Sequence, residues 1–285
     1  MLGPDDLVLC AGTVSQAPFA ERVAAAAEGG FRGISLFLSD YDQARADGLS
    51  DADMRAMLGD HGLEVSELDP LMNWLPGAEL GSSANPQGEA FFRHGESDFH
   101  AAAEALGARS LNAVLVTDTA PPFPEIAEAF AGVCDRAAEH GLVVHLEFLP
   151  WTPIRDVAAA LEIVEMAGRP NGGVMIDSWH HFRSGTDNEV LRRVPGARIL
   201  GVQLNDAPRE PEPDVIAETT RRRLLPGEGD IDLVELVRIL DKAGSRAPIG
   251  VEVFSEKLFA LPAREVARRA GEAVREVLRQ VRSGS

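Results

Sequence analysis

The sequence predicts a single (β/α)8 TIM barrel over residues 1–285. Short β-rich runs alternate with longer segments of helical period, and eight such pairs follow one another along the chain. No Pro- or Ser-rich linker and no change of composition divides the sequence, and α/β barrels commonly reach this length as one domain. An open doubly wound sheet is the main alternative. The turn after its first strand would carry a GxGxxG pattern, whereas the sequence there reads CAGTVSQ.

The elements follow one another in a regular order. The predicted strands cover residues 7–12, 33–38, 64–69, 110–116, 142–148, 173–177, 198–206 and 249–254. Helical segments lie near residues 16–28, 51–60, 88–107, 123–140, 153–168, 184–194, 232–243 and 262–281. Glycines that typically end a helix stand shortly before four strands: Gly62, Gly107, Gly141 and Gly244. Two long connections remain, residues 70–87 and 207–230.

Composition and charge narrow the range of functions. With 45% hydrophobic residues, the chain can bury a large core. The net charge of −18 argues against nucleic acid and anionic membranes, which both attract clustered Lys and Arg. Cys10 and Cys134 are far apart, so neither a disulfide framework nor a thiolate zinc site is expected. The acidic N-terminus and the lack of a window of about 20 apolar residues lead us to expect a soluble cytoplasmic protein.

Four consecutive predicted strands carry an oxygen-bearing side chain near their C-terminal ends, which is where the active sites of such barrels lie. The residues are Glu147, Asp177, Gln203 and Glu252. Taken singly, each is more commonly a helix cap, a solvated loop residue or a satisfied polar residue. Three converging carboxylates would repel one another unless a cation lay between them. Three carboxylates and one amide oxygen form a hard ligand set, so the matching positions favour a site for Mn²⁺ or Mg²⁺.

Several motifs together resemble a known family. LEFLP, MIDSWHH, VQLND and VEVFS, with RLLPGEGDID at residues 223–232, are similar to the xylose isomerase-like barrels. That superfamily includes sugar phosphate isomerases and epimerases, ketose 3-epimerases, hydroxypyruvate isomerases, inosose dehydratases and dehydroshikimate dehydratases. Its AP endonuclease branch is not expected, because that branch needs a histidine-rich trinuclear zinc site and a basic DNA-binding face. This chain has seven histidines and a strong negative charge.

The resemblance implies one divalent metal ion held by Glu147, Asp177, position 203 and Glu252. The family has histidine at position 203, and this chain has Gln203. A neutral amide oxygen is a harder ligand than imidazole, which favours Mn²⁺ or Mg²⁺ over Co²⁺ or Zn²⁺. Glutamine at this position is similar to some dehydroshikimate dehydratases. The resemblance also implies that Glu147 and Glu252 double as acid and base groups, and that His180 lies near the metal as a third catalytic residue.

The resemblance further places Arg223, which opens RLLPG, against the substrate, with Arg209 as the alternative; arginine runs such as residues 221–223 are otherwise usually solvated. His145 should point into the barrel, either as a substrate contact or as a satisfied core histidine, and His181 is expected to be structural. The tryptophans follow strand ends, so Trp74, Trp151 and Trp179 are expected to wall the pocket. Residues 72–77 are a candidate lid.

The predicted function is that of a metal-dependent isomerase or epimerase. It would act on a sugar-like α-hydroxy ketone through a metal-stabilised enediolate, with a small polyhydroxylated molecule as substrate. Loss of a β-hydroxyl from the same enolate would give a dehydratase of the 3-dehydroshikimate or inosose type, which is the first alternative. The second is a non-catalytic sugar-binding barrel, against which the set of three carboxylates argues. Apolar helix faces of such a barrel can also form a homo-oligomer.

Overall fold

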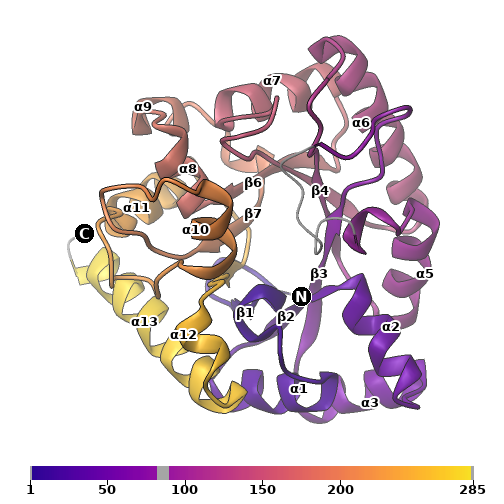
Figure 1. Ribbon diagram of the computed structural model, residues 1–285, viewed down its shortest axis with the longest axis vertical. Coiled ribbons are helices and arrows are strands. Elements are labelled where there is room, and N and C mark those ends of the chain that lie inside the picture. Colours follow the sequence, from indigo (N-terminus) through magenta and orange to yellow (C-terminus); the bar gives the residue numbers. More distant parts are fainter. Residues whose placement is uncertain (1, 82–89, 284–285) are drawn as a thin grey trace.

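Eight parallel strands close into a barrel that is ringed by helices (Figure 1). The computed structural model describes residues 2–81 and 90–283. Each strand pairs with the next along the chain, and the last pairs with the first. The strands are β1 (Leu7–Leu9), β2 (Gly33–Phe37), β3 (Glu64–Leu71), β4 (Ser110–Val114), β5 (Val143–Glu147), β6 (Gly172–Asp177), β7 (Ile199–Leu204) and β8 (Ile249–Val251). The predicted (β/α)8 fold is therefore confirmed.

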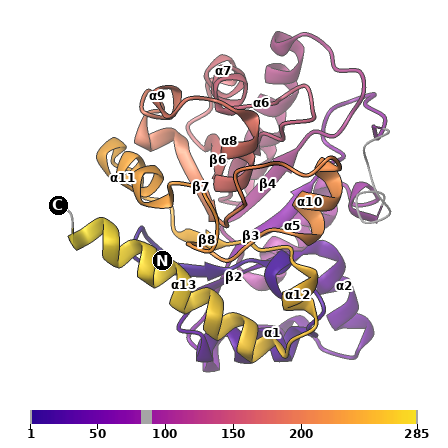
Figure 2. The ribbon, with the colours of Figure 1, turned by 60° about the vertical axis from the view of Figure 1, so that its left-hand side comes forward.

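The helices occupy the connections between these strands. They are α1 (Phe19–Glu28), α2 (Leu38–Ala46), α3 (Asp51–Asp60), α5 (Glu96–Leu106), α6 (Phe123–Glu139), α7 (Val157–Ala167), α8 (Ser178–Ser184), α9 (Asn188–Leu191), α10 (Val215–Arg221), α11 (Leu233–Ala243), α12 (Glu256–Phe259) and α13 (Ala263–Ser283). Two short 3₁₀ helices, η1 (Ala11–Val14) and η2 (Gly196–Arg198), complete the described elements. Helix α13 packs along α1, which brings the last helix against the first (Figures 1 and 2).

Several short helices near the strand ends differ from the sequence prediction. The prediction of one helix over residues 184–194 is wrong, because α8 begins at Ser178 and ends at Ser184. Gly185 follows with a φ of 68°, which only glycine adopts readily, and the chain then forms the four-residue α9. Helix α10 lies within the predicted connection 207–230, where the side chain of Asp214 caps it. Within the helix predicted over residues 88–107, residues 90–92 are helical, and α5 then begins separately at Glu96.

The strands alternate as the sequence predicts. In β5, Val144 and Leu146 are fully buried in the apolar layer between barrel and helices. His145 and Glu147 take the opposite face, toward the barrel interior, as the period of two requires. The interior is tightly filled around β7, because a side chain at Gly201 would come within 2.7 Å of the His145 ring. Burying apolar side chains such as those of Val144 and Leu146 stabilises the fold by about 1.5–3 kcal/mol each.

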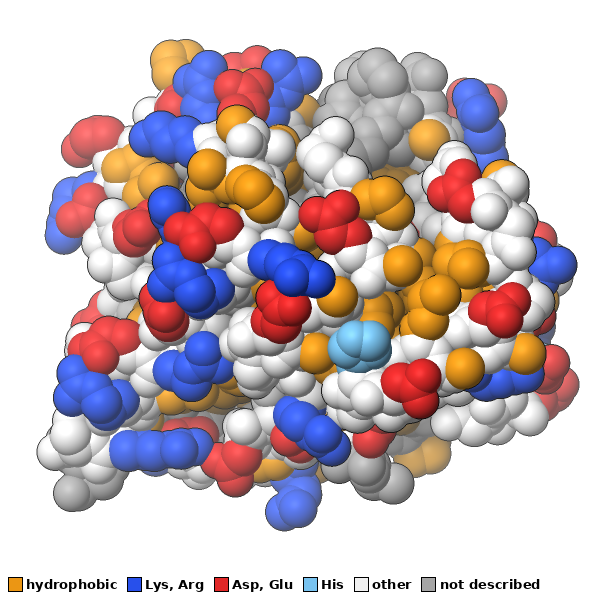
Figure 3. Space-filling model, turned by 90° about the horizontal axis from the view of Figure 1, so that it is seen from below, with side chains coloured by type: hydrophobic (Ala, Val, Ile, Leu, Met, Phe, Trp, Pro, Cys, Tyr) orange, Lys and Arg blue, Asp and Glu red, His pale blue; other side chains and the backbone are white. Residues whose placement is uncertain are grey.

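The surface is mixed in charge. Acidic and basic side chains are interspersed with apolar ones over the face shown in Figure 3. Among the described residues, no helix is long and apolar enough to cross a membrane.

Candidate active site

Among the described residues, five buried carboxylates, each at most 6% exposed, belong to β3, β5, β6 or the residue after β8: Glu67, Asp69, Glu147, Asp177 and Glu252. Two come from β3, two end β5 and β6, and Glu252 follows β8 directly. The three predicted carboxylate ligands are thus all buried in this part of the fold. Asp177 has two roles, because it ends β6 and its Oδ1 accepts a hydrogen bond of 2.9 Å from the His180 amide, which caps α8.

Arg223 supplies positive charge among these groups. Its Nη1 lies 3.0 Å from Asp177 Oδ2 and 3.3 Å from Glu252 Oε2. The guanidinium is held from behind by Thr219, whose carbonyl accepts from Nε and whose hydroxyl accepts from Nη2, both at 2.9 Å. The backbone is also fixed, since the Arg223 amide donates to the Phe254 carbonyl at 3.0 Å. Arg223 therefore lies among the buried carboxylates, whereas Arg209 is exposed.

Two asparagines donate hydrogen bonds to the carboxylates. Asn112 on β4 donates both amide hydrogens, to Asp69 Oδ1 at 2.8 Å and to Glu147 Oε2 at 2.6 Å. Asn205, just after β7, donates to Asp177 Oδ2 at 2.7 Å. These hydrogen bonds hold the carboxyl groups of Asp69, Glu147 and Asp177 in place.

The polar atoms left without partners fit a bound cation. Glu252 Oε1 and Gln203 Oε1 are buried and accept no hydrogen bond from a described residue. Glu147, Asp177 and His180 each offer a ligand atom, and the three atoms lie within 4.8 Å of one another. Two of these residues were predicted as ligands, and the third was predicted beside the metal. Gln203 Nε2 donates to Glu67 Oε1 at 3.2 Å, which leaves its carbonyl oxygen for another partner. Buried oxygens of this kind suit a divalent metal ion.

His180 lies between the carboxylates and two tryptophan rings. Its Nε2 is 3.4 Å from Glu147 Oε1 and 3.3 Å from Arg223 Nη2. Trp151 and Trp179 pack against it, with ring centroids 5.6 Å and 5.2 Å away. Burial and the nearby Arg223 charge lower the pKa of His180 to about 3, so its imidazole is neutral at physiological pH.

The pKa values of the buried carboxyl groups shift in the opposite direction. Burial, and then the charge of Glu67, raise the pKa of Asp69 to about 8. Burial and the charges of Asp69, Glu252 and Asp177 raise the pKa of Glu147 well above its usual range. Burial also raises the pKa of Glu252 strongly, against the opposing effect of Arg223. Without a cation, this cluster therefore binds protons that ordinary carboxylates have lost.

These shifts predict that the metal-free protein loses stability as pH rises from 6.5 to 8. A carboxyl with a raised folded-state pKa binds more protons folded than unfolded, so its contribution is lost between about pH 4 and its folded pKa. His180 acts in the opposite sense, but only below about pH 6.5. We expect the Tm to fall by roughly 2–4 °C per pH unit for each carboxyl that loses its proton in this range, at about 1 kcal/mol per carboxyl. Calorimetry of the metal-free protein across this pH range measures the fall in Tm.

Two variants and one addition control that experiment. Asp69→Asn should make the fall of Tm with pH smaller. Asp60→Asn, at an exposed position of α3, should leave that fall unchanged. Saturating Mn²⁺ should abolish the fall, because a cation replaces the protons. A metal-free Tm that stays level or rises over this range would contradict the prediction.

A cavity of about 140 Å³ opens beside these groups. Glu147, His180, Arg223 and Glu252 line one side, and Trp151 is part of the wall. The cavity therefore brings the predicted catalytic residues to one space, with apolar surface around them.

Two of the tryptophans predicted to contact the substrate lie elsewhere. Trp179 is fully buried behind His180, and it is not among the residues that line the cavity. Trp74 donates its indole hydrogen to the Val114 carbonyl and packs against Phe130, away from the cavity. In the lid candidate, residues 72–77, Met72 lines the cavity and Leu75 is buried, and residues 82–87 of the same connection lie outside the described residues.

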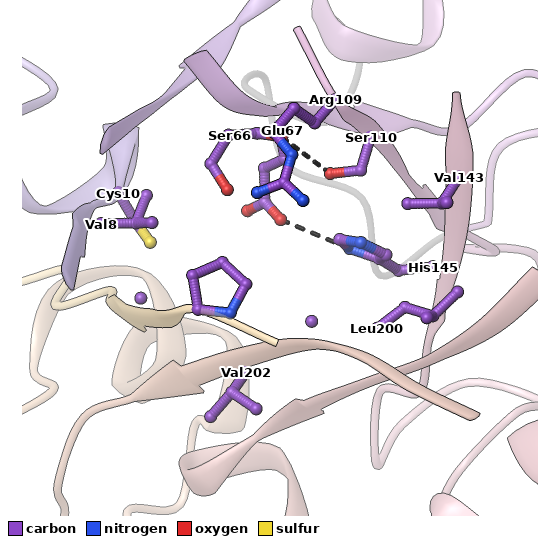
Figure 4. Close-up of a pocket in the computed structure, with 13 residues that line it drawn as sticks. Val8, Cys10, Ser66, Glu67, Arg109, Ser110, Val143, His145, Leu200 and Val202 are labelled. Carbon is purple, nitrogen blue, oxygen red and sulfur yellow. Dashed lines mark hydrogen bonds and ion pairs between the residues drawn. The ribbon is translucent and has the colours of Figure 1, made fainter. Parts of the chain in front are cut away.

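His145 lines a second, smaller cavity in the barrel interior, with Glu67, Ser66 and Cys10 (Figure 4). Its Nδ1 is 3.4 Å from Glu67 Oε2, and the two side chains point toward each other (Figure 4). The volume is about 40 Å³, which is room for roughly three water molecules. His145 is thus an interior histidine that does not line the 140 Å³ cavity. His181 Nε2 donates a hydrogen bond to Asn188 Oδ1 at 2.9 Å, which agrees with a structural role.

Comparison with known proteins identifies the family. The sequence matches the family described as "Xylose isomerase-like TIM barrel" over residues 23–280.

The chain belongs to the xylose isomerase-like TIM barrel family.

Relatives in this family carry two kinds of name. A 3-dehydroshikimate dehydratase of Pseudomonas aeruginosa is 28% identical over 254 residues, which is 86% of this chain and 37% of that protein. The chain thus spans little more than a third of this relative. An inosose isomerase of Bacillus velezensis is 29% identical over 204 residues, covering 68% of this chain and 72% of the relative. Both names are those of enzymes.

A solved structure supports the fold of this family member. The IOLI protein, described with a bound zinc atom, superimposes with a TM-score of 0.84 and 21% identity. The match covers 97% of this chain and 99% of that one.

Four polar residues of this site were not predicted from the sequence. They are Glu67, Asp69, Asn112 and Asn205. The test applied to β5–β8 would have found Asp69, had it been extended to the end of the third predicted strand. Asn112 lies in the middle of the fourth, so that test would not have found it. Glu67 gave no such signal, because the register of β3 against β2 shifts beside it.

Proposed function

We propose that the protein is a divalent-metal-dependent isomerase or epimerase that acts on a sugar-like α-hydroxy ketone. The observation that carries the proposal is the convergence of Glu147 and Glu252, both with raised pKa, on one cavity that also contains His180 and Arg223. General bases work best when their pKa lies near the working pH, and burial has moved both glutamates in that direction.

The proposed metal ligands are Glu147, Asp177, Gln203 and Glu252, with His180 as the alternative to one of them. The unpartnered oxygens of Gln203 and Glu252 support this set. We favour Mn²⁺ or Mg²⁺, because most of these atoms are oxygens. A bound divalent ion would polarise the carbonyl of an α-hydroxy ketone and make the adjacent C–H more acidic.

The side chains would then divide the proton transfers. One of Glu147 and Glu252 removes the proton next to the carbonyl, and the other returns a proton to the opposite face or to the neighbouring carbon. The first outcome is epimerisation and the second is isomerisation. Arg223 would bind a substrate oxygen, and Asp69, with a pKa of about 8, would be protonated at pH 7 and able to donate to a hydroxyl. Trp151 would exclude water from one side.

A dehydratase of the 3-dehydroshikimate type is the second candidate. The relation to the Pseudomonas aeruginosa dehydratase over 86% of this chain favours it, as does Gln203 at the position of the usual histidine. Removal of the same proton would begin the reaction, and a β-hydroxyl would leave as water.

Proton exchange with solvent tests the shared first step. The purified protein is incubated in D₂O with 2-keto-myo-inositol or 3-dehydroshikimate, with and without Mn²⁺. We expect Mn²⁺-dependent deuterium incorporation next to the carbonyl, read by NMR. A rearranged sugar then identifies the isomerase, and loss of water identifies the dehydratase. If the protein takes up no metal and binds these compounds without exchange, the non-catalytic barrel replaces both.

A further inference from the structure

We propose that the site continues into an outer cavity that binds an uncharged ring, attached to the part of the ligand that reacts. This rests on the proposed function for the location of the reacting part. The outer cavity has a volume of about 490 Å³ and lies next to the inner one of about 140 Å³. The two cavities share four lining residues, which therefore lie at the border between them: Phe37, Phe91, Thr220 and Phe254.

The volumes indicate that a ligand extends across this border. Pockets for small molecules usually enclose about 300–1,000 Å³. The inner cavity alone falls below that range, and the outer cavity brings the site into it. A ligand held by the carboxylates and Arg223 would therefore have room for a substituent on the side of β1, β2 and β8.

Phenylalanine rings form the border between the cavities. The Phe37 ring lies 4.8 Å from Phe91 and 6.3 Å from Phe254, nearly parallel to the latter at 14°. Phe259 adds a fourth ring to the outer wall. Phe91, Phe254 and Phe259 are partly exposed, although aromatic side chains are usually covered in the folded state. Such faces bind flat apolar surfaces, including other rings and the C–H faces of sugars.

A glycine makes room for one of these rings. A Cβ atom at Gly12 would lie 2.5 Å from the Phe254 ring, so the ring can rest on the backbone there only because residue 12 is glycine. This contact sets the position of Phe254 between the two cavities.

The charged residues of the outer wall have partners already. Asp40 pairs with the buried Arg22 and also accepts from the Phe37 amide at 3.0 Å. Arg221 lies 3.7 Å from Glu256. Each charged residue that lines this cavity thus has a partner of opposite sign among the described residues. A phosphate or carboxylate would find no such unpaired cation there, so the wall suits a neutral ring with hydroxyl groups at its rim.

The test compares two glycosides that differ in one ring. Phenyl β-D-glucopyranoside and methyl β-D-glucopyranoside are titrated calorimetrically into the Mn²⁺-treated protein. We expect the phenyl compound to bind about ten-fold more tightly, since a buried aromatic contact contributes about 1 kcal/mol or more. Ser39→Trp and Gln16→Trp, which fill the outer cavity from two elements, should remove this difference and leave methyl glycoside binding unchanged.

The matched control is Gln43→Trp, one turn along α2 from Ser39 and exposed to solvent, which should keep the preference. Equal affinities in the wild type, no binding of the phenyl compound, or a preference that survives both filling variants would overturn the proposal. Because binding is measured without turnover, these results are separate from those of the exchange experiment. Loss of deuterium exchange with an intact ring preference would reject the proposed reaction alone.

Discussion

Glu252→Gln should abolish tight binding of Mn²⁺ and slow α-hydrogen exchange by about 10²–10⁴-fold, the usual contribution of a positioned acid or base. Glutamine keeps the shape of the side chain but removes the charge that a cation and Arg223 share. Glu252 is 4% exposed, and its Oε1 has no partner among the described residues, so the substitution acts on an atom that is free to bind. Metal content by mass spectrometry and the exchange rate by NMR are the two measurements.

Glu139→Gln is the control for this substitution. Glu139 ends α6 on the surface, so the variant has the same chemistry and the same change in net charge. It should retain metal and exchange. If Glu252→Gln bound one Mn²⁺ per chain as tightly as the wild type, Glu252 would not be a ligand, and the group of Glu147, Asp177 and His180 would have to hold the ion.

Much of this site could be predicted because parallel strands impose a strict order. Their carboxyl ends meet at one mouth, and side chains alternate between two faces. Reading the last inward residue of β5 and β6 is then enough to find Glu147 and Asp177. In the structure Gln203 pairs in register with Asp177 and with Gly250, which explains why residues from different strands reach one level of the barrel.

The features that were not predicted lie where the chain departs from this regular order. Between β2 and β3, Ile34 pairs with Val65 and Ser35 with Glu67. Ser66 of β3 is therefore an extra residue that changes the alternation of side chains between the two faces. Val65 joins the apolar layer, while Glu67 reaches the interior cavity. No propensity marks such a bulge in the sequence. The short helices α8 and α10 were also missed, because they are held by single caps and tertiary contacts rather than by helical period.

Trp179 shows how position after a strand can mislead. It follows Asp177 closely in sequence, which predicted a place in the pocket wall. As the second residue of α8, it instead turns behind His180, where its indole donates to Glu218 at 3.2 Å. Arg183 donates to the same buried carboxylate at 2.8 Å. This contact network joins α8 to α10, and it could be seen only once both short helices were placed.

Arg223→Gln should cost the metal-free protein about 3–5 kcal/mol, because removing one partner of a buried ion pair leaves the other charges uncompensated. Arg223 is 3% exposed, and it is an ion-pair partner of both Asp177 and Glu252. The expected fall in Tm is roughly 10 °C at pH 8. It should be smaller at pH 6, since Glu252, whose pKa burial raises, can there take up a proton in place of the lost cation.

Arg222→Gln separates this effect from the general loss of an arginine. Arg222 is the preceding residue, and its half-exposed side chain pairs with Glu212 at the surface. Such pairs contribute at most about 1 kcal/mol, so the Tm should hardly change. Mn²⁺ should restore part of the stability of Arg223→Gln, because a divalent ion among the carboxylates replaces the missing charge. If both variants lost the same stability, or if Mn²⁺ restored none of it, the guanidinium would not be the counter-charge of this cluster.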